Sequence, residues 1–307
     1  MEKIDLVVLY VDSEDKNWQK LYKQYAPQSA DVQITGKQRF RGNPHFVYLF
    51  RGIEKYAPWI NNIFLVVQSQ SQVPYWINQK KVKIVLHEDF IPAEYLPLFS
   101  SQAIEMFLHK IPSLSEKFLY ANDDNYIVGD VKPEDFFTED NKVKTSFSYI
   151  KYGSEEAMPL WKQAIVNSAL LINKTETEQL KKEGGCITPM HGMRPYFKSK
   201  IEEVHNLYEN NILNSISKFR ESKNFTVYVY DFYLRKLGLT EDKNYKFAYF
   251  ASWCKASDIC TAIINPHLYK TICINDTKEE EDRKRIAAIT EHFESQFPNL
   301  SKYEALN

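Results

Sequence analysis

Short apolar runs alternate with helix-period stripes through the first half of the chain. The stripes over residues 45–56 and 104–111 predict helices, each followed by a proline. The apolar runs are rich in β-branched residues and predict four buried strands: residues 4–11, 63–67, 82–86 and 118–121. Strands and helices that alternate with short connections predict an α/β fold, in which helices flank a mostly parallel sheet.

The second half has a less regular pattern, which predicts mainly helices. The elements expected there are helices over 160–171, 225–237 and 286–297, a polar helix or loop over 174–183, and strands over 143–150 and 269–274. No repeat, low-complexity tract or linker divides the chain. The sequence therefore predicts one catalytic unit over 1–307, with an α/β core in 1–150 and a mostly helical part in 151–307 that completes the site.

Composition limits the class of protein. The chain has 307 residues, 44% of them hydrophobic and 26% charged, which is ordinary for a globular domain. Lys and Arg number 39 against 40 Asp and Glu, and this balance argues against a nucleic-acid partner. No apolar stretch approaches the about 18 residues of a membrane-spanning helix.

The N-terminus and the cysteines both predict a cytoplasmic protein. Met1 to Lys3 leads directly into a strand pattern, without the apolar segment of a signal peptide. The 4 cysteines form no C-x-x-C motif, and reduced thiols are the simplest interpretation. The spacing of Cys254, Cys260 and His267 matches no usual zinc finger.

Acidic residues follow three of the predicted strands. Asn122, Asp123 and Asp124 follow one strand, Asp12 follows the first, and Asp276 follows the last. The ends of parallel strands meet at one edge of a sheet, where open α/β sheets bind ligands. Adjacent carboxylates at such an edge suit a divalent cation that shares its ligands with a phosphate. Turns that use Asn and Asp to bond their own backbone remain the alternative.

Arginines offer candidate phosphate ligands. Arg39 and Arg41 alternate, so an extended segment would direct both guanidinium groups to the same side, where they could bind phosphate oxygens. Arg194 and Arg220, with Lys198 and Lys200, could add positive charge from the second half. A solvated basic stretch is the alternative interpretation.

His191 is the candidate general base among the 7 histidines. It lies in a loop punctuated by glycine and proline, and a neutral imidazole can take a proton from a sugar hydroxyl. A structural histidine is the alternative. The sequence contains neither the G-x-S-x-G motif of serine hydrolases nor the G-x-G-x-x-G motif of dinucleotide-binding folds.

Taken together, these residues resemble the Stealth family of sugar-phosphate transferases. That family includes bacterial capsule and cell-wall polysaccharide polymerases and the catalytic subunit of the lysosomal-enzyme phosphotransferase. The resemblance runs in order through four segments: Ile4 to Trp18, Arg39 to Phe137, His191 to Arg220, and Ile272 to Pro298. The chain departs from the family pattern at a few positions: Leu9-Tyr10 in place of Thr-Trp, Ser13 in place of Gly, Gln102 in place of His, and Met193 in place of Pro.

The resemblance implies an activity and a cofactor. A hexose-1-phosphate or N-acetylhexosamine-1-phosphate would pass from a UDP-sugar to a hydroxyl of a glycan or lipid-linked oligosaccharide. The product would be a phosphodiester and the leaving group UMP, in capsule, cell-wall or exopolysaccharide biosynthesis. The resemblance also implies a GT-A-like, Rossmann-type core and dependence on Mg²⁺ or Mn²⁺.

With the resemblance, the candidate residues take roles. The metal would be held by Asp123, Asp124 and Asp276, with His191 as the base. Further catalytic roles fall to Asp12, Asp124 and Arg220. Asp12 would orient the donor or acceptor, and Arg41, Arg194 and Arg220 would neutralise the phosphate. The expected substrate-binding residues are Tyr10, Arg39, Arg41, Asn43, Asn122, Arg194 and Asn275.

Two other functions stay open at this point. A metal-dependent glycosyltransferase would share the acidic motif and the nucleotide-sugar donor, but would release UDP. A non-catalytic module that binds a glycan or nucleotide would release neither nucleotide. The sugar, the acceptor, the oligomeric state and a peripheral association with the inner face of the membrane also stay open.

Overall fold

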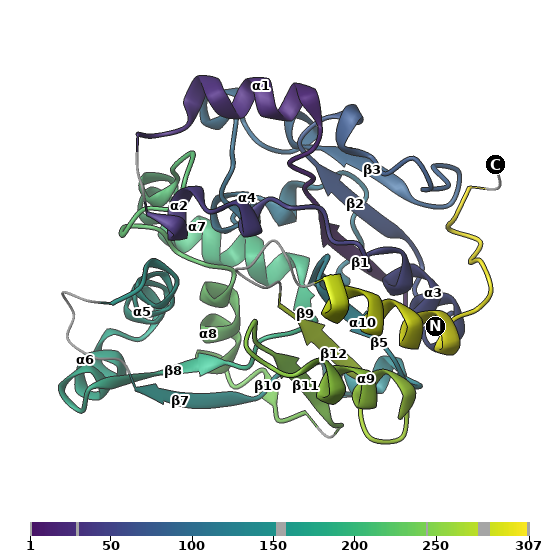
Figure 1. Cartoon of the computed structure of the whole chain (residues 1–307). Coiled ribbons are helices and arrows are strands. Elements are labelled where there is room, and N and C mark those ends of the chain that lie inside the picture. The colour runs from purple at the N-terminus through teal and green to yellow at the C-terminus, as the bar shows by residue number, and fades with distance from the viewer. Residues whose placement is uncertain (1, 29–30, 152–157, 244, 276–282, 306–307) are drawn as a thin grey trace.

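A computed structural model describes residues 2–28, 31–151, 158–243, 245–275 and 283–305 (Figure 1). Its main sheet has the strand order β3-β2-β1-β4-β9. The first four strands are parallel, and β9 runs antiparallel to β4. The five strands are β1 (Ile4–Leu9), β2 (Ile63–Val67), β3 (Lys83–Leu86), β4 (Lys117–Asn122) and β9 (Arg194–Phe197).

The central strands are mostly apolar because both faces of the sheet are covered. All residues of β1 and β2 are buried, as expected for parallel strands between layers of helices. Leu6 of β1 pairs with Ile63 on one side and Leu119 on the other. Helix α3 (Val47–Tyr56) adds Leu49, Phe50 and Ile53 to the same core. This core extends along the chain as far as Tyr303.

Among the described residues, three smaller sheets accompany the main one. They pair β11 (Phe247–Phe250) with β12 (Thr271–Ile274) and β5 (Asn125–Ile127), β7 (Phe147–Lys151) with β8 (Gly185–Pro189), and β10 (Thr240–Glu241) with β6 (Val143–Lys144). Figure 1 shows the β7–β8 pair at the opposite end of the molecule from α1 (Lys16–Tyr25).

The other helices cover the sheets or join them. They are α2 (Val32–Thr35), α4 (Ser101–Glu105), α5 (Leu160–Ile172), α6 (Lys174–Lys182), α7 (Lys198–Ser215), α8 (Tyr228–Lys236), α9 (Ala256–Ile264) and α10 (Arg283–Gln296). Phe293 of α10 stacks on Tyr48 of α3 with 4.8 Å between ring centroids, so the last helix returns to the first half of the chain. Within the described ranges, no helix combines the length and the apolar composition that crossing a membrane requires.

The main sheet reverses its strand order between β1 and β4. From β1, the chain goes to β2 and β3 on one side and to β4 on the other. In open α/β sheets, such a switch point opens a crevice at the carboxyl ends of the two strands. The crevice therefore lies where Asp12 and Asp123 follow β1 and β4.

The acidic turn after β4 also joins two sheets. Asp123 and Asp124 form the turn, and Asn125 already belongs to β5, which pairs with β12. The amide of Ile274, the last residue of β12, donates to the Asp124 carbonyl over 2.9 Å. This bond brings Asn275 next to the acidic turn, as expected if the last strand contributes to the site.

The structure confirms an α/β fold with a largely parallel sheet flanked by helices. Three details differ from the expectation. Residues 143–150 form parts of β6 and β7 outside the main sheet, residues 104–111 do not form one helix, and the predicted loop at 190–195 runs into strand β9. The second half contains β8 to β12 as well as α5 to α10, so it is less helical than its periodicity predicts.

Candidate active site

A cleft of about 1430 Å³ opens at the carboxyl ends of β1 and β4. It brings together segments that lie far apart in the sequence, including the loop before α3, the turn after β4 and the loop before β9. The predicted site residues that line it are Tyr10, Arg39, Arg41, Asn43, Asn122, Asp123, Asp124, His191, Arg194, Arg220 and Asn275. Asp12 lies beside this lining, and Asp276 falls outside the described residues.

Asp12 is held at the acidic edge of the cleft. Its backbone N–H donates to Gln72 Oε1 and its carbonyl accepts from Gln72 Nε2, both over 2.8 Å. A Cβ on Gly42 would lie 3.0 Å from the Asp12 carboxyl carbon, so a larger residue there would press on this side chain. Burial raises the pKa of the Tyr10 phenol, and the charges of Asp12 and Asp123 raise it further. The neutral Tyr10 phenol therefore lies beside the carboxylates of Asp12 and Asp123, which make this edge of the cleft negative.

Asp124 is half-buried, and no cationic side chain of the described residues is among the groups that shift its pKa. Burial raises the pKa of its carboxyl group to about 6, while hydrogen bonds from the Cys273 thiol and the Asn125 amide oppose the shift. The Asn125 bond measures 2.6 Å. Both donors are neutral, so a bound cation would stabilise the ionised carboxylate. The carboxylates of Asp123 and Asp124 are the hard oxygen ligands that Mg²⁺ and Mn²⁺ prefer.

Imidazole and thiol donors lie beside this carboxylate. Ligand atoms of Asp124, His191 and Cys273 all lie within 4.8 Å of one another. Nitrogen and sulfur ligands favour softer ions such as Zn²⁺. Asp124 therefore belongs both to the predicted acidic pair and to this mixed cluster. Cys273 was not predicted to lie next to Asp124, because the sequence around it indicates only a buried strand.

Two arginines approach each other on the cationic side of the cleft. Burial and the nearby Arg220 lower the pKa of Arg39 to about 9. Burial lowers the pKa of Arg220 to about 10, although the negative charge of Glu105 acts to raise it. Both groups stay charged at neutral pH. The buried Nε of each lacks a hydrogen-bond partner within the described part of the chain, so the pair is suited to receive an anion.

An aromatic cluster explains why these two arginines meet. Phe40 and Phe219 follow and precede them in the sequence, and both join a small core with Trp18 and Phe99. Phe99 and Phe219 stack with 4.9 Å between centroids, and the centroids of Trp18 and Phe40 are 5.1 Å apart. Packing of the rings thus fixes the loops that carry the guanidinium groups.

Glu105 is a further cleft residue that sequence reasoning did not single out. It is 4% exposed. It accepts hydrogen bonds of 2.9 Å from the Tyr120 hydroxyl and the Val227 amide. Burial raises its pKa, and Arg220 counteracts this effect. The sequence did contain a signal for Glu105, which is an acidic residue among the apolar residues of a predicted helix. Such a residue is seldom buried without a partner.

His191 is neutral and oriented. Burial, together with the charges of Arg194 and Lys243, lowers its pKa to about 3. Its Nδ1 lies 3.0 Å from the Tyr228 hydroxyl, and the ring of Tyr249 meets it edge-on at 5.2 Å. When Nδ1–H donates to Tyr228, the lone pair of Nε2 is free to accept a proton.

Arg194 is committed to protein partners. Its guanidinium donates to Asp231 over 3.1 Å and to the Met190 carbonyl over 2.9 Å, and it lies 4.1 Å from the centroid of the Tyr228 ring. Although burial disfavours the charge, Asp231 raises the pKa of Arg194. This arrangement fixes both Tyr228 and the segment that precedes His191, which is a positioning role.

The predicted asparagines also have protein partners. The Asn43 amide donates to the Asp123 carbonyl and the Tyr126 hydroxyl, both over 2.7 Å, and so anchors the acidic turn. Asn122 accepts from the Tyr120 hydroxyl over 2.8 Å. Asn275 donates to the Tyr249 hydroxyl over 3.0 Å. All three line the cleft while they hold neighbouring groups in place.

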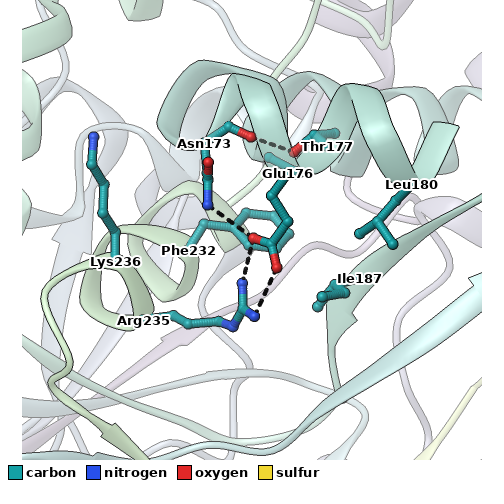
Figure 2. A pocket seen from close by; sticks show the side chains of 9 residues that line it. Asn173, Glu176, Thr177, Leu180, Ile187, Phe232, Arg235 and Lys236 are labelled. Carbon is teal, nitrogen blue, oxygen red and sulfur yellow. Dashed lines mark hydrogen bonds and ion pairs between the residues drawn. The ribbon is translucent and has the colours of Figure 1, made fainter.

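A smaller hollow of about 300 Å³ between α6 and α8 has a different character (Figure 2). In it, Arg235 and Glu176 point toward each other and form bonds of 2.7 and 2.9 Å (Figure 2). The Asn173 amide also donates to Glu176 over 2.9 Å. Glu176 and Arg235 thus satisfy each other, and Lys236 donates to the Ile172 carbonyl, which favours the large cleft as the site of chemistry.

Known proteins resemble the chain along its whole length. Residues 39–145 match the model of the Stealth protein conserved region 2. Receptor polysaccharide phosphotransferase WefC of Streptococcus oralis is 29% identical over 99% of this chain and 100% of its own length. Capsular polysaccharide phosphotransferase WcwK of Streptococcus pneumoniae is 29% identical over 93% of this chain and 94% of its own. Capsular polysaccharide phosphotransferase cps1A of Actinobacillus pleuropneumoniae is 34% identical over 71% of this chain and 60% of its own.

The fold and the cleft define an α/β protein with a polar ligand site at the switch point of a mostly parallel sheet. The matched region contains the first arginines and the acidic turn of that site. The chain therefore contains conserved region 2 of the Stealth proteins and resembles polysaccharide phosphotransferases over nearly its whole length, as its sequence motifs predict.

Proposed function

We propose that the protein transfers a sugar-1-phosphate from a nucleotide-diphospho-sugar to a glycan hydroxyl during synthesis of a capsular polysaccharide. The observation that carries this proposal is the pairing of Arg39 with Arg220 in the same cleft as the acidic turn. Two half-buried guanidinium groups, whose buried Nε–H groups have no hydrogen-bond partner in the described residues, suit a diphosphate. The names of the full-length relatives, which are polysaccharide phosphotransferases, agree with this chemistry.

In the proposed reaction, the acceptor hydroxyl oxygen attacks the phosphorus that bears the sugar. A new P–O bond forms, and the bond from this phosphorus to the bridging oxygen breaks. UMP leaves with the bridging oxygen and its electron pair when the donor is a UDP-sugar. The hydroxyl proton passes to His191, and the sugar becomes linked to the glycan by a phosphodiester.

The residues of the cleft take the following roles. His191 accepts the proton at Nε2, while Tyr228 holds Nδ1. Arg39 and Arg220 bind the diphosphate and stabilise the charge that builds on the leaving phosphate. Asp12 orients a substrate at the negative edge. Arg41 extends the cationic lining of the cleft.

Divalent metal fits the acidic turn. Asp123 and Asp124 would hold Mg²⁺ or Mn²⁺, and the raised pKa of Asp124 supports this choice, because a cation would favour its ionised form. Such an ion, when bound, neutralises phosphate charge. The strand order around the switch point also agrees with a GT-A-like core.

The released nucleotide tests the proposal. A panel of UDP-sugars is incubated with the protein, Mg²⁺ or Mn²⁺ and candidate glycan acceptors, and the products are separated by anion-exchange chromatography. We expect release of UMP. The release should stop when a chelator is added, and its rate should fall about 10²–10³-fold in Arg220→Gln. Arg235→Gln is the matched control, because Arg235 forms its ion pair in the hollow of Figure 2.

Each other result has a defined meaning. UDP in place of UMP would assign the protein to the glycosyltransferases that break the bond at the anomeric carbon. Full activity in both Arg220→Gln and His191→Ala would refute the roles given to the cleft. Absence of turnover with every donor tested would refute the proposed transfer from UDP-sugars.

A further inference from the structure

Two exposed aromatic side chains, one on β11 and one on the turn that follows it, line the cleft. Tyr249 is 44% exposed and Trp253 is 71% exposed, and both line the cleft. The proposed donor explains the arginines and the acidic turn, but it does not use these rings. Large aromatic side chains left in solvent at a polar cleft are typical of binding surfaces.

Tyr249 is fixed beside the proposed base. It lies on β11, where it pairs with Cys273 of β12. Its hydroxyl accepts a hydrogen bond of 3.0 Å from Asn275, and its ring meets the His191 imidazole edge-on. A molecule resting on the open surface of this ring would therefore be next to His191.

Trp253 lies on an ordered turn that follows the same strand. The Cys254 amide donates to the Ala251 carbonyl over 2.9 Å and closes the turn. Arg285 of α10 donates to the Ser252 carbonyl over 2.6 Å, so the turn is tied to a helix. The indole is thus presented to solvent by a backbone that is held on both sides, which lowers the entropic cost of binding.

The chemistry of these two rings differs from that of the arginines. Tyr249 and Trp253 offer neutral, apolar faces with a polar rim, whereas a diphosphate needs cations. A pyranose has the complementary form, with C–H groups on one face and hydroxyls around the edge. The acceptor must also place one hydroxyl at His191, and the Tyr249 ring is in direct contact with that imidazole.

We propose that Tyr249 and Trp253 form an acceptor platform that binds a pyranose ring of the glycan and directs its hydroxyl toward His191. The inference rests on the proposed function, because it assigns the platform to the acceptor of that reaction. It gives the platform a task separate from donor binding, so the two can be tested separately.

Binding is tested first, without turnover. Methyl hexopyranosides are mixed with the wild-type protein, Trp253→Ala and Tyr75→Ala, and saturation-transfer NMR detects contact between sugar C–H groups and the protein. Tyr75 is the control because it is 86% exposed and lies outside the residues that line the cleft. We expect transfer in the wild type and Tyr75→Ala, and its loss in Trp253→Ala. Equal signals in all three proteins, or no signal in the wild type, would overturn the platform.

Steady-state kinetics then separate acceptor from donor. The acceptor is the methyl hexopyranoside that most increases nucleotide release. In Trp253→Ala we expect its KM to rise about fivefold to tenfold, the scale of an aromatic contact, with the donor KM and the kcat retained. A rise in donor KM alone would mean that the ring binds the nucleobase, and would overturn the proposal. If the wild type releases no nucleotide, the proposed function fails, whereas the NMR result still decides whether the rings bind a sugar.

Discussion

Replacing Arg194 with methionine is expected to lower the free energy of unfolding by about 3–5 kcal/mol. The side chains of Arg194 and Asp231 are 3% and 2% exposed, and 3.1 Å separates their charged atoms. Methionine retains much of the volume but leaves the Asp231 carboxylate as a buried charge. Its remaining donors are the hydroxyls of Tyr196 at 2.6 Å and Thr145 at 3.3 Å, which do not neutralise it.

Urea unfolding, followed by tryptophan fluorescence and far-UV circular dichroism, measures this loss. The double variant Arg194→Met/Asp231→Asn removes the unpaired charge. Its single amide oxygen can accept from Tyr196, while its NH₂ group can donate to the Thr145 hydroxyl. It should be about 2 kcal/mol more stable than Arg194→Met. Wild-type stability in Arg194→Met would refute the reasoning. So would additive losses, because two residues in direct contact should be coupled.

The same variant distinguishes a positioning role from a binding role. Arg194 lies against the ring of Tyr228, which in turn contacts His191. Under conditions where Arg194→Met is folded, we expect a lower kcat and an unchanged KM for the nucleotide sugar. If Arg194 instead binds the donor directly, the KM for the nucleotide sugar will rise, because the variant loses a contact that stabilises the bound donor.

Three further predictions concern other groups of the cleft. Arg39→Gln should raise the thermal midpoint, because it relieves repulsion with Arg220, and should weaken donor turnover; a lower midpoint with full activity would contradict this. Tyr228→Phe should reduce kcat about tenfold through loss of the hydrogen bond to His191, and a pH–rate profile identical to that of the wild type at full rate would exclude the contact. The raised pKa of Asp124, about 6, means that protonation favours the folded state, so its contribution without metal is lost as pH rises from about 4 to about 6. Mn²⁺ should therefore raise the thermal midpoint more at about pH 7.5 than at about pH 5, and an equal or smaller rise at the higher pH would argue against binding at Asp124.

The parallel core could be predicted because its strands are buried on both faces. Such strands read as uninterrupted apolar runs, and the run at 63–67 coincides with β2. Strand β9 could not be predicted, since Arg194 and Pro195 are poor strand signals. Proline is tolerated there because β9 is the edge strand of the sheet. Its place beside β4 depends on tertiary packing rather than on local preference.

The candidate active site could likewise be predicted from the sequence only in part. Convergence of Asp12 with the turn after β4 follows from strand ends in a parallel sheet. The approach of Arg39 to Arg220 depends on the ring cluster of Phe40 and Phe219, which no local pattern reveals. The contact between His191 and Tyr228 likewise joins a loop to a helix that follows it much later in the chain. The sequence motifs identify the chemical groups of the site, whereas long-range packing determines which of them lie close enough to act together.

The electrostatics of the cleft indicate how the proposed ligands would depend on each other. Burial opposes the charge of Asp124 on the acidic edge and the charges of Arg39 and Arg220 on the cationic side. A cation alone relieves the first cost, and a diphosphate alone relieves the second. A diphosphate that carries its own divalent cation relieves both and adds the attraction between the two ligands. Each ligand should therefore increase the affinity for the other by the same factor, since coupling between two binding sites is reciprocal.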